Sequence, residues 1–371
     1  MARSSSYRGR LAPSPTGYLH LGHARTFWVA WQRARAANGK LIFRNEDLDY
    51  QRCKPEFVRA MYEDLHWLGL DWDEGPDISF QSGKSGQPVR PDLGGVVSHG
   101  DSGRGSFGPY SQSERRSFYL DAWRKLRDSG LIYPCTCSRK DLERALSAPH
   151  EETSPGAEFH HLNDCGPQAA SPAIAKDPSS QPGAAAVLFL TEGPSSQSAT
   201  VQTPPDDELP YPGTCREKIG TARDYDSPAG VSWRFKVPDN ETISFADGYF
   251  GRREFVTGRD FADFLLWRRD DIPSYQLAVV VDDAAMQIRE VVRGADLLKS
   301  TARQMLLISA LGYRVPAYFH CPLLRDEKNV RLAKRHDALS LRNLREQRAD
   351  RKVLRKKFAD ELKWDRGLVK P

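Results

Sequence analysis

Two histidines near the N-terminus, His20 and His23, stand on either side of Gly22 in the segment LHLGH. Imidazoles at this spacing can face one phosphate chain and donate hydrogen bonds to its oxygens while a phosphoanhydride bond breaks. The glycine lets backbone approach closely, and a helix beginning here adds the positive end of its dipole. Because an H-x-G-H tetrapeptide alone is more often structural, its surroundings must decide its role.

Other charged and polar residues stand where strands are expected to end. Glu46 follows KLIFRN within the acidic segment EDLD, where it is either a fixed anion or an ordinary turn former. Tyr275 opens YQLAVVVDD and by itself reads as core, whereas Arg293, before Gly294, is harder to explain by packing. Lys334 lies in the basic run RLAKR, which is otherwise a solvated surface.

Cysteine chemistry indicates a possible metal site. Cys135 and Cys137 form a C-x-C pair that can present two thiolates to zinc, but a tetrahedral structural site needs two more ligands. His160, His161 and Cys165 are ordinary zinc ligands by their chemistry. Lone C-x-C pairs also occur without any metal, so that alternative stays open.

These residues need a scaffold, and hydrophobic periodicity predicts an α/β domain. A strand is expected over residues 7–13, a helix over 19–31, a strand over 40–45 and a helix over 57–68. Such alternation favours a parallel sheet with ligands at the carboxyl ends of its strands. Further helices are expected over residues 115–131 and 300–311 and beyond residue 339. Further strands are expected from residue 231 and over 274–281.

Composition limits the function classes. The 371-residue chain has 39% apolar residues, no apolar leader and no long apolar run, so we expect a cytoplasmic protein without a membrane partner. The six cysteines are too few for a secreted disulfide framework. From Arg325 onward, 16 Lys and Arg face 8 Asp and Glu, which suggests a nucleic acid partner or simply a solvated helical surface.

The string GRLAPSPTGYLHLGHAR resembles the opening signature of class I glutamyl-tRNA synthetases and their short relatives. The resemblance implies that His20, His23 and Lys334 are catalytic and that they bind ATP together with Gly22. The run RLAKR occupies the place of the KMSKS loop in degenerate form. It further implies a glutamate pocket formed by Arg10, Leu11, Ala12, Pro13, Ser14, Glu46, Tyr275 and Arg293. In this pocket Glu46 holds the α-ammonium, Arg10 pairs with a carboxylate and Arg293 reads the side-chain carboxylate.

In the short relatives the C-x-C pair is completed by Y-x-x-x-C, a spacing matched by Tyr211 and Cys215. The resemblance therefore ranks these two above the histidines as partners of Cys135 and Cys137 in one structural Zn²⁺ site. A long insertion separates the two halves, but closure entropy grows slowly with length. Mg²⁺ is expected to accompany ATP.

The resemblance also implies a division of the chain. Residues 7–132 form the first half of a Rossmann-like catalytic domain, with a flexible insertion at 82–109. Residues 133–230 form an inserted acceptor or zinc subdomain whose Pro/Ser-rich part, 148–210, is expected to be flexible. Residues 231–344 form the second half with the KMSKS-like loop, and 345–371 a basic helical tail.

Only 36 residues follow Arg335, so the resemblance leads us to expect that the anticodon-binding domain of the full-length synthetases is missing. The chain thus resembles the truncated glutamyl-queuosine tRNA(Asp) synthetases, and we expect this ligase to be a monomer. The implied reaction is activation of L-glutamate with ATP, followed by transfer to queuosine in the anticodon loop of tRNA(Asp). The alternatives are a truncated enzyme that charges the 3′ end of tRNA(Glu) and an inactive RNA-binding module.

Overall fold

The computed structural model describes residues 7–76, 105–138, 140–141, 211–217, 222–324 and 340–362, all of which belong to one compact unit of the chain. The expected site residue Lys334, the alternative zinc ligands His160, His161 and Cys165, and nearly all of both expected insertions lie outside these ranges. No helix within them is long and apolar enough to cross a membrane.

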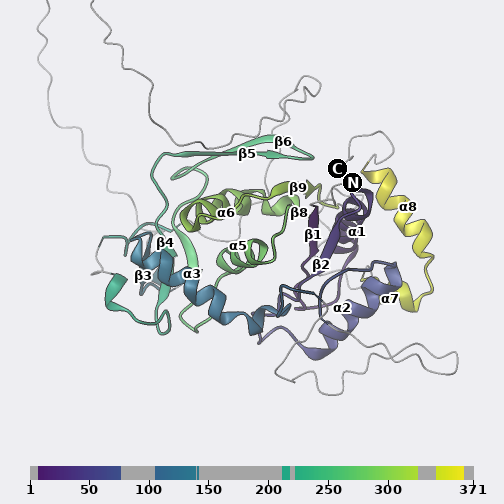
Figure 1. Cartoon of the computed structure of the whole chain (residues 1–371), viewed down its shortest axis with the longest axis horizontal. Helices are drawn as coiled ribbons and strands as arrows, with labels where there is room; N and C mark the ends of the chain where they lie inside the picture. The colour runs from purple at the N-terminus through teal and green to yellow at the C-terminus, as the bar shows by residue number, and fades with distance from the viewer. Residues whose placement is uncertain are drawn as a thin grey trace, which may run out of the picture. The chain divides into compact units, whose positions relative to one another are not determined.

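The helices are α1 (Leu21–Ala36), α2 (Pro55–Leu68), α3 (Arg116–Asp128), α5 (Tyr275–Ala285), α6 (Leu298–Leu311), α7 (Leu341–Glu346) and α8 (Arg351–Glu361), as Figure 1 shows. The strands are β1 (Arg8–Leu11), β2 (Lys40–Phe43), β3 (Ile132–Cys135), β4 (Ser232–Phe235), β5 (Thr242–Asp247), β6 (Gly251–Val256), β7 (Phe264–Trp267), β8 (Glu290–Gly294) and β9 (Ala317–Cys321). Short 3₁₀ turns cover Gln112–Glu114, Ala222–Asp224 and Ala295–Leu297.

Parallel strands carry the predicted site. β1 pairs in parallel with β2, and β8 pairs in parallel with β9, which also pairs with β5. The backbone N–H of Arg289 donates to the carbonyl of Arg8 over 2.8 Å, so β1 and β8 lie side by side. The predicted α/β fold with parallel strands is thereby confirmed, and antiparallel pairs are added by β6 beside β5 and by the β3, β4, β7 sheet.

Helix α1 covers β1 and β8 with an apolar face that includes Trp28 and Val29. Its far end is tied to β8 by Arg33, whose guanidinium lies 2.6 Å from the carboxylate of Glu290. Tyr7 donates to the same carboxylate over 2.6 Å. Burial of the apolar face and this ion pair together fix the helix that begins at the histidine motif.

The segment over residues 274–281, expected to be a buried strand, is instead the helix α5, and that prediction was wrong. Ser274 caps the helix, its Oγ accepting from the N–H of Leu277 over 3.4 Å. Packing overrides the strand preference of the Val-rich run because the helix is buried on most of its surface. The helical turn also carries Asp282 and Asp283 to charged partners from other elements.

The last residues of the first expected insertion, 105–109, lie within the described part of the chain. The buried guanidinium of Arg115 donates to the backbone carbonyls of Phe107 and Pro109 over 3.2 and 2.8 Å. The guanidinium of Arg8 lies 4.5 Å from the Phe107 ring centre. Residues 105–109 therefore pack against the rest of the domain, because the buried Arg115 guanidinium holds two of their backbone carbonyls by hydrogen bonds.

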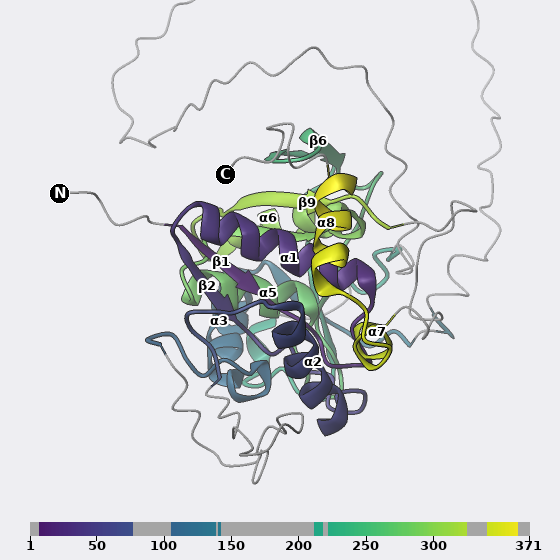
Figure 2. The same ribbon diagram turned by 90° about the vertical axis from the view of Figure 1, so that its right-hand side faces the viewer.

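The helices expected beyond residue 339 are present as α7 and α8, whereas residues 363–371 of the expected basic tail lie outside the described ranges. α8 crosses α1 (Figure 2) and packs against it, with the Phe358 and Trp28 ring centres 6.1 Å apart. The carboxylate of Glu361 lies 3.1 Å from the guanidinium of Arg25 on α1. One face of α8 is thus part of the core, and only its other face is a solvated surface.

Candidate active site

A cavity of ≈ 350 Å³ opens where β1 and β8 end and α1 begins. Ten of the residues expected in the site line it together: Arg10, Ala12, Pro13, Ser14, His20, Gly22, His23, Glu46, Tyr275 and Arg293. Leu11 does not, because its fully buried side chain packs into the core. This location, at the carboxyl ends of parallel strands, is where open α/β sheets bind ligands.

The acidic and basic groups on one side of the cavity belong to a buried ion network. Arg44, fully buried, lies 2.9 Å from the Glu46 carboxylate and 2.7 Å from that of Asp283. Arg10 approaches Asp283 to 3.5 Å through its Nε and donates from Nη1 to the carbonyl of Val292 over 2.8 Å. Glu46 and Arg10 are therefore linked through Arg44 and Asp283.

The network continues away from the cavity through Asp282. Arg115 pairs with this carboxylate over 2.6 Å, and Gln112 and Tyr119 donate to it over 2.8 and 3.0 Å. Arg44, Arg115 and the two aspartates were not predicted from the sequence as site residues. The sequence does show two adjacent carboxylates, Asp282 and Asp283, directly after an apolar run. Their partners could not be recognised because they come from distant parts of the chain.

Burial shifts the pKa values of these groups. Burial raises the pKa of Glu46 despite the opposing effect of Arg44. For Arg44, burial acts to lower the pKa, but the carboxylates of Asp283, Glu46 and Asp282 raise it well above its ordinary value. A charged guanidinium thus stands behind Glu46 at the cavity wall.

Arg293 lies on β8 at another part of the cavity wall. Its Nη1 is 3.4 Å from the Tyr275 hydroxyl, Nη2 donates to Thr301 over 2.7 Å, and Nε donates to His320 over 3.2 Å. None of these partners within the described ranges is a carboxylate. Its positive charge is therefore available to an anion that enters the cavity.

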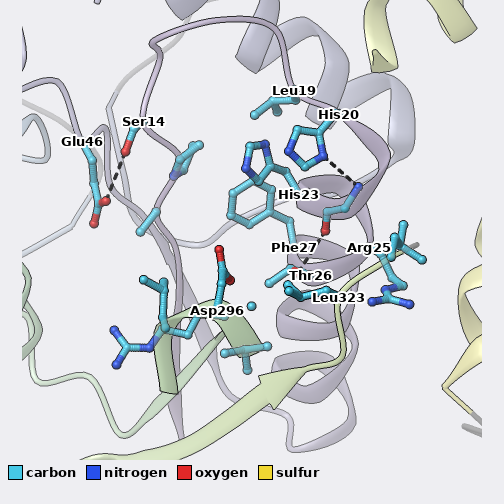
Figure 3. Close-up of a pocket in the computed structure, with 18 of the residues that line it drawn as sticks. Ser14, Leu19, His20, His23, Arg25, Thr26, Phe27, Glu46, Asp296 and Leu323 are labelled. Atoms are coloured by element: carbon cyan, nitrogen blue, oxygen red, sulfur yellow. Dashed lines mark hydrogen bonds between the residues drawn. The ribbon is translucent and has the colours of Figure 1, made fainter. Parts of the chain in front are cut away.

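The histidine motif is organised at the first turn of α1. His20 caps this helix, its Nδ1 accepting from the N–H of Gly22 over 3.1 Å, and its ring stacks on that of His23 at 3.7 Å. A Cβ at position 22 would lie 2.9 Å from the His20 ring, so only glycine fits there without a shift. Figure 3 shows both rings across the cavity from Ser14 and Glu46.

Several residues lining the cavity were not singled out from the sequence. Asp296 points into the space between Glu46 and His23 (Figure 3), and Arg25 and Thr26 follow the motif on α1. Arg25 also donates to the carbonyl of Pro322, just beyond β9. The basic and acidic residues of this wall surround the helix N-terminus, where phosphates bind well.

The expected zinc ligands converge although a long stretch of sequence separates them. The Sγ atoms of Cys135, Cys137 and Cys215 lie within 4.8 Å of one another. The Tyr211 hydroxyl is 3.5 Å from the Cys135 sulfur and 3.8 Å from that of Cys137. The donor set and its spacing fit a thiolate-rich metal site.

The pKa values within this cluster differ. Burial acts to raise the pKa of Cys215, but hydrogen bonds from Tyr211 and the backbone lower it to about 7. Burial and the neighbouring Cys215 raise the pKa of Cys137 to about 11. The Cys215 thiol therefore ionises near neutral pH, whereas a bound cation would be needed to deprotonate Cys137 there.

Comparison with known proteins defines the class to which this fold and cavity belong. The family described as tRNA synthetases class I (E and Q), catalytic domain, matches residues 6–162 and 211–359. The chain therefore belongs to this family of class I ligases, whose members use ATP.

Similar proteins narrow the comparison. Glutamyl-Q tRNA(Asp) synthetase of Symbiobacterium thermophilum is 40% identical over 91% of this chain and 80% of its own length. The protein of the same name from Nitratidesulfovibrio vulgaris is 38% identical over 91% of this chain and 81% of its own. Glutamate–tRNA ligase 2 of Acidithiobacillus ferrooxidans is 36% identical, but this chain spans only 54% of its length.

A solved structure shares the fold. The crystal structure of a glutamate tRNA ligase from Elizabethkingia meningosepticum aligns with 89% of this chain at a TM-score of 0.59 and 24% identity. The chain spans 52% of that ligase. The likeness shows a common catalytic-domain fold.

Proposed function

We propose that this chain activates L-glutamate with ATP to glutamyl-adenylate and transfers the glutamyl group to queuosine in the anticodon loop of tRNA(Asp). The proposal rests chiefly on the charges that converge on the cavity: the anion Glu46 and the cations Arg10 and Arg293. Glutamate carries one cationic and two anionic groups, which this set complements. The choice of tRNA(Asp) as the acceptor of the glutamyl group is supported by the names of the two relatives from S. thermophilum and N. vulgaris.

Each charge of the substrate has a partner in this proposal. Glu46 holds the α-ammonium group, and Arg10 pairs with the α-carboxylate beside it. Arg293, whose described hydrogen-bond partners are uncharged, binds the side-chain carboxylate together with the Tyr275 hydroxyl. Glutamine would lose this charge-assisted interaction, so the site favours the acid.

The first step joins glutamate to AMP. A carboxylate oxygen of glutamate attacks the α-phosphorus of ATP, the bond to the bridging oxygen of the β-phosphate breaks, and pyrophosphate leaves. His20 and His23 donate to phosphate oxygens as negative charge builds up on them, next to the N-terminus of α1. Lys334, assigned from the sequence, would neutralise the same phosphates, and Mg²⁺ bound to ATP would supply further charge.

In the second step a queuosine hydroxyl attacks the carbonyl carbon of the adenylate, and AMP leaves with the bonding electrons. The RNA is expected to contact the outward face of α8, where Lys352, Lys356 and Lys357 are exposed. Lysines arranged along one helix face suit a phosphate backbone and give no base specificity.

Two assays test this proposal. Glutamate-dependent exchange of pyrophosphate into ATP should proceed without tRNA and should fall strongly in Lys334→Ala. Acylation should occur with queuosine-containing tRNA(Asp) and not with queuosine-free tRNA(Asp) or tRNA(Glu). Charging of tRNA(Glu) would contradict the acceptor assignment, and no exchange at all would contradict glutamate activation.

The RNA surface has its own test. Replacing Lys352, Lys356 and Lys357 by glutamine should raise the KM for tRNA and reduce its salt dependence, because fewer counterions are released on binding. Exchange without tRNA should be unchanged in this variant. An unchanged KM for tRNA would show that these lysines of α8 do not contribute to RNA binding.

Cys135, Cys137, Tyr211 and Cys215 would hold one structural Zn²⁺, which would bind β3 to the segment around residue 215. Purified protein should contain about one zinc per chain, and Cys215→Ser should lose it while Cys53→Ser keeps it. Loss of zinc should lower the melting temperature without changing the KM for glutamate, since the cluster does not line the cavity. A metal-free protein of unchanged stability would contradict this assignment.

A further inference from the structure

A buried histidine lies behind Arg293 and does not line the cavity. His320 on β9 is fully buried, and its Nε2 is 3.2 Å from the Arg293 Nε and 3.0 Å from the Thr301 hydroxyl. Its Nδ1 lies 2.6 Å from Oδ2 of Asp247, at the end of β5. The contacts form a continuous series from Asp247 through His320 to Arg293.

The hydrogen-bond partners determine where the imidazole proton lies. A guanidinium only donates, so Nε2 of His320 must accept from Arg293 and carry no proton. The Asp247 carboxylate only accepts, so Nδ1 carries the proton. Burial is the largest influence on the pKa of His320 and lowers it, Asp247 opposes this, and Arg293 lowers it further. The ring is therefore neutral with its proton on Nδ1.

Asp247 is itself held rigidly. Its Oδ1 accepts from the backbone N–H groups of Tyr249 and Phe250 over 3.0 and 2.9 Å, and Oδ2 accepts from the N–H of His320 over 3.1 Å. The turn between β5 and β6 thus fixes the carboxylate that selects the tautomer of His320. Such a supporting shell orients a functional group without touching the ligand.

We propose that His320, held by Asp247, is a positioning residue that fixes the Arg293 guanidinium and thereby determines selectivity for a substrate with an acidic side chain over its amide. The proposal rests on the proposed function, in which Arg293 binds the side-chain carboxylate of glutamate. It assigns specificity to two residues outside the cavity wall.

The group behind the Arg293 guanidinium must be a neutral hydrogen-bond acceptor. His320 accepts a hydrogen bond from the Nε–H and Thr301 accepts one from Nη2, which leaves N–H groups on Nη1 and Nη2 for the cavity. A carboxylate in place of His320 would neutralise the guanidinium and weaken its hold on an anionic substrate. A protonated imidazole would repel the guanidinium instead.

Two substitutions of His320 distinguish the roles of its two ring nitrogens. His320→Asn keeps a donor near the Nδ1 position but loses the acceptor for Arg293, whereas His320→Gln can place an oxygen near the Nε2 position. In pyrophosphate exchange, His320→Asn should raise the KM for glutamate about tenfold or more, as expected for a lost charge-assisted hydrogen bond. It should also reduce the preference for glutamate over glutamine and leave the KM for ATP unchanged. His320→Gln should restore much of both properties.

Asp247→Asn tests the role of the tautomer. An amide can donate to Nδ1 and so stabilise the tautomer with its proton on Nε2, which can no longer accept from Arg293. Its effect on the KM for glutamate should resemble that of His320→Asn, and the double variant should show less than the sum of the two effects. Ile308→Ala on α6, a buried truncation that does not line the cavity, serves as the control for lost stability alone.

The wild-type protein gives a direct readout that needs no variant to fold. Nitrogen NMR of the histidine rings at pH 7.5 should show a neutral ring for His320 with its proton on Nδ1, and a protonated ring or the other tautomer would overturn the proposal. It would also be overturned if His320→Asn kept the KM and selectivity of wild type, or if Ile308→Ala changed them equally. Failure of the wild-type protein to exchange with glutamate would instead contradict the proposed function.

Discussion

The two sides of the cavity are built in different ways. The side with Arg10 and Glu46 depends on a buried ion network drawn from β1, the segment after β2, and α5. The side with His20 and His23 is organised within four residues at the start of α1, by a cap hydrogen bond and ring stacking. Charges that recognise an amino acid are therefore placed by the tertiary fold, whereas the phosphate-facing motif is largely set by local sequence.

This difference has consequences for substitutions. Damage to the ion network should appear first as lost stability and weaker glutamate binding, because buried charges lose their partners. Damage to the histidine motif should appear as a slower chemical step with the fold intact, because these rings act on charge that develops in the transition state.

The largest effect is expected for Arg44→Met. Removing this buried guanidinium leaves Glu46 and Asp283 without their shared cation and should lower the free energy of unfolding by about 3–5 kcal/mol. Urea denaturation measures it. Arg52→Met, which removes an exposed cation 2.6 Å from Asp49, is the matched control and should cost under about 1 kcal/mol. Equal losses would mean that the network contributes nothing beyond a surface ion pair.

His23→Ala should separate the two sides kinetically. We expect kcat for pyrophosphate exchange to fall about 10²–10³-fold, as for loss of one donor to a developing oxyanion, with little change in the KM for glutamate. Steady-state kinetics measure both constants. His66→Ala, at the exposed end of α2, should leave both unchanged. A rise in the KM for glutamate without loss of kcat would contradict the division into two sides.

Glu46 predicts how glutamate binding depends on pH. Because burial raises its pKa, Glu46 takes up a proton at a higher pH than an ordinary glutamate, and the neutral form no longer attracts an ammonium group. The KM for glutamate should therefore rise as the pH falls, while the KM for ATP stays level. Glu46→Gln should have a high KM at every pH. A KM in wild type that stays constant down to pH 5 would rule out this role.

Asp64 on α2 is a buried carboxylate that does not line the cavity. Neither of its buried oxygens has a hydrogen-bond partner in the described part of the chain, and the nearest Arg345 nitrogen lies 3.3 Å away. Burial raises its pKa to about 7, although Arg345 opposes this. The native state therefore favours the protonated form, and the stability that Asp64 contributes is lost as the pH rises toward 7.

Asp64→Asn should consequently be more stable than wild type by up to about 4 kcal/mol at pH 8, with the advantage vanishing near pH 4. Thermal melts across this pH range provide the measurement. Asp360→Asn, on the exposed face of α8, is the control and should follow the wild-type curve. An advantage for Asp64→Asn that is the same at pH 4 and pH 8 would show that its ionisation is not involved.

Much of the arrangement could be predicted from local patterns. The order of strands and helices over residues 7–68 follows from hydrophobic periodicity, and the HLGH motif occupies the helix start where it was expected. α5 could not be predicted in this way, because its Val-rich run has the composition of a buried strand. The ion network was missed for a related reason: Arg44, Arg115 and Asp282 are far apart in sequence and show their relation only once packed.

By itself the sequence determined the residue types and the local geometry: histidines separated by a glycine at a helix start, and cysteines and a tyrosine at the spacings of a metal site. Only the tertiary structure decided how the charges are paired, with Arg44 behind Glu46 and His320 behind Arg293. The physical reason is that a helix cap depends on neighbours a few residues away. A buried ion pair or a histidine tautomer depends instead on groups brought together from distant parts of the chain. In the interior the dielectric constant is low, so each charged or hydrogen-bonding partner has a large electrostatic effect.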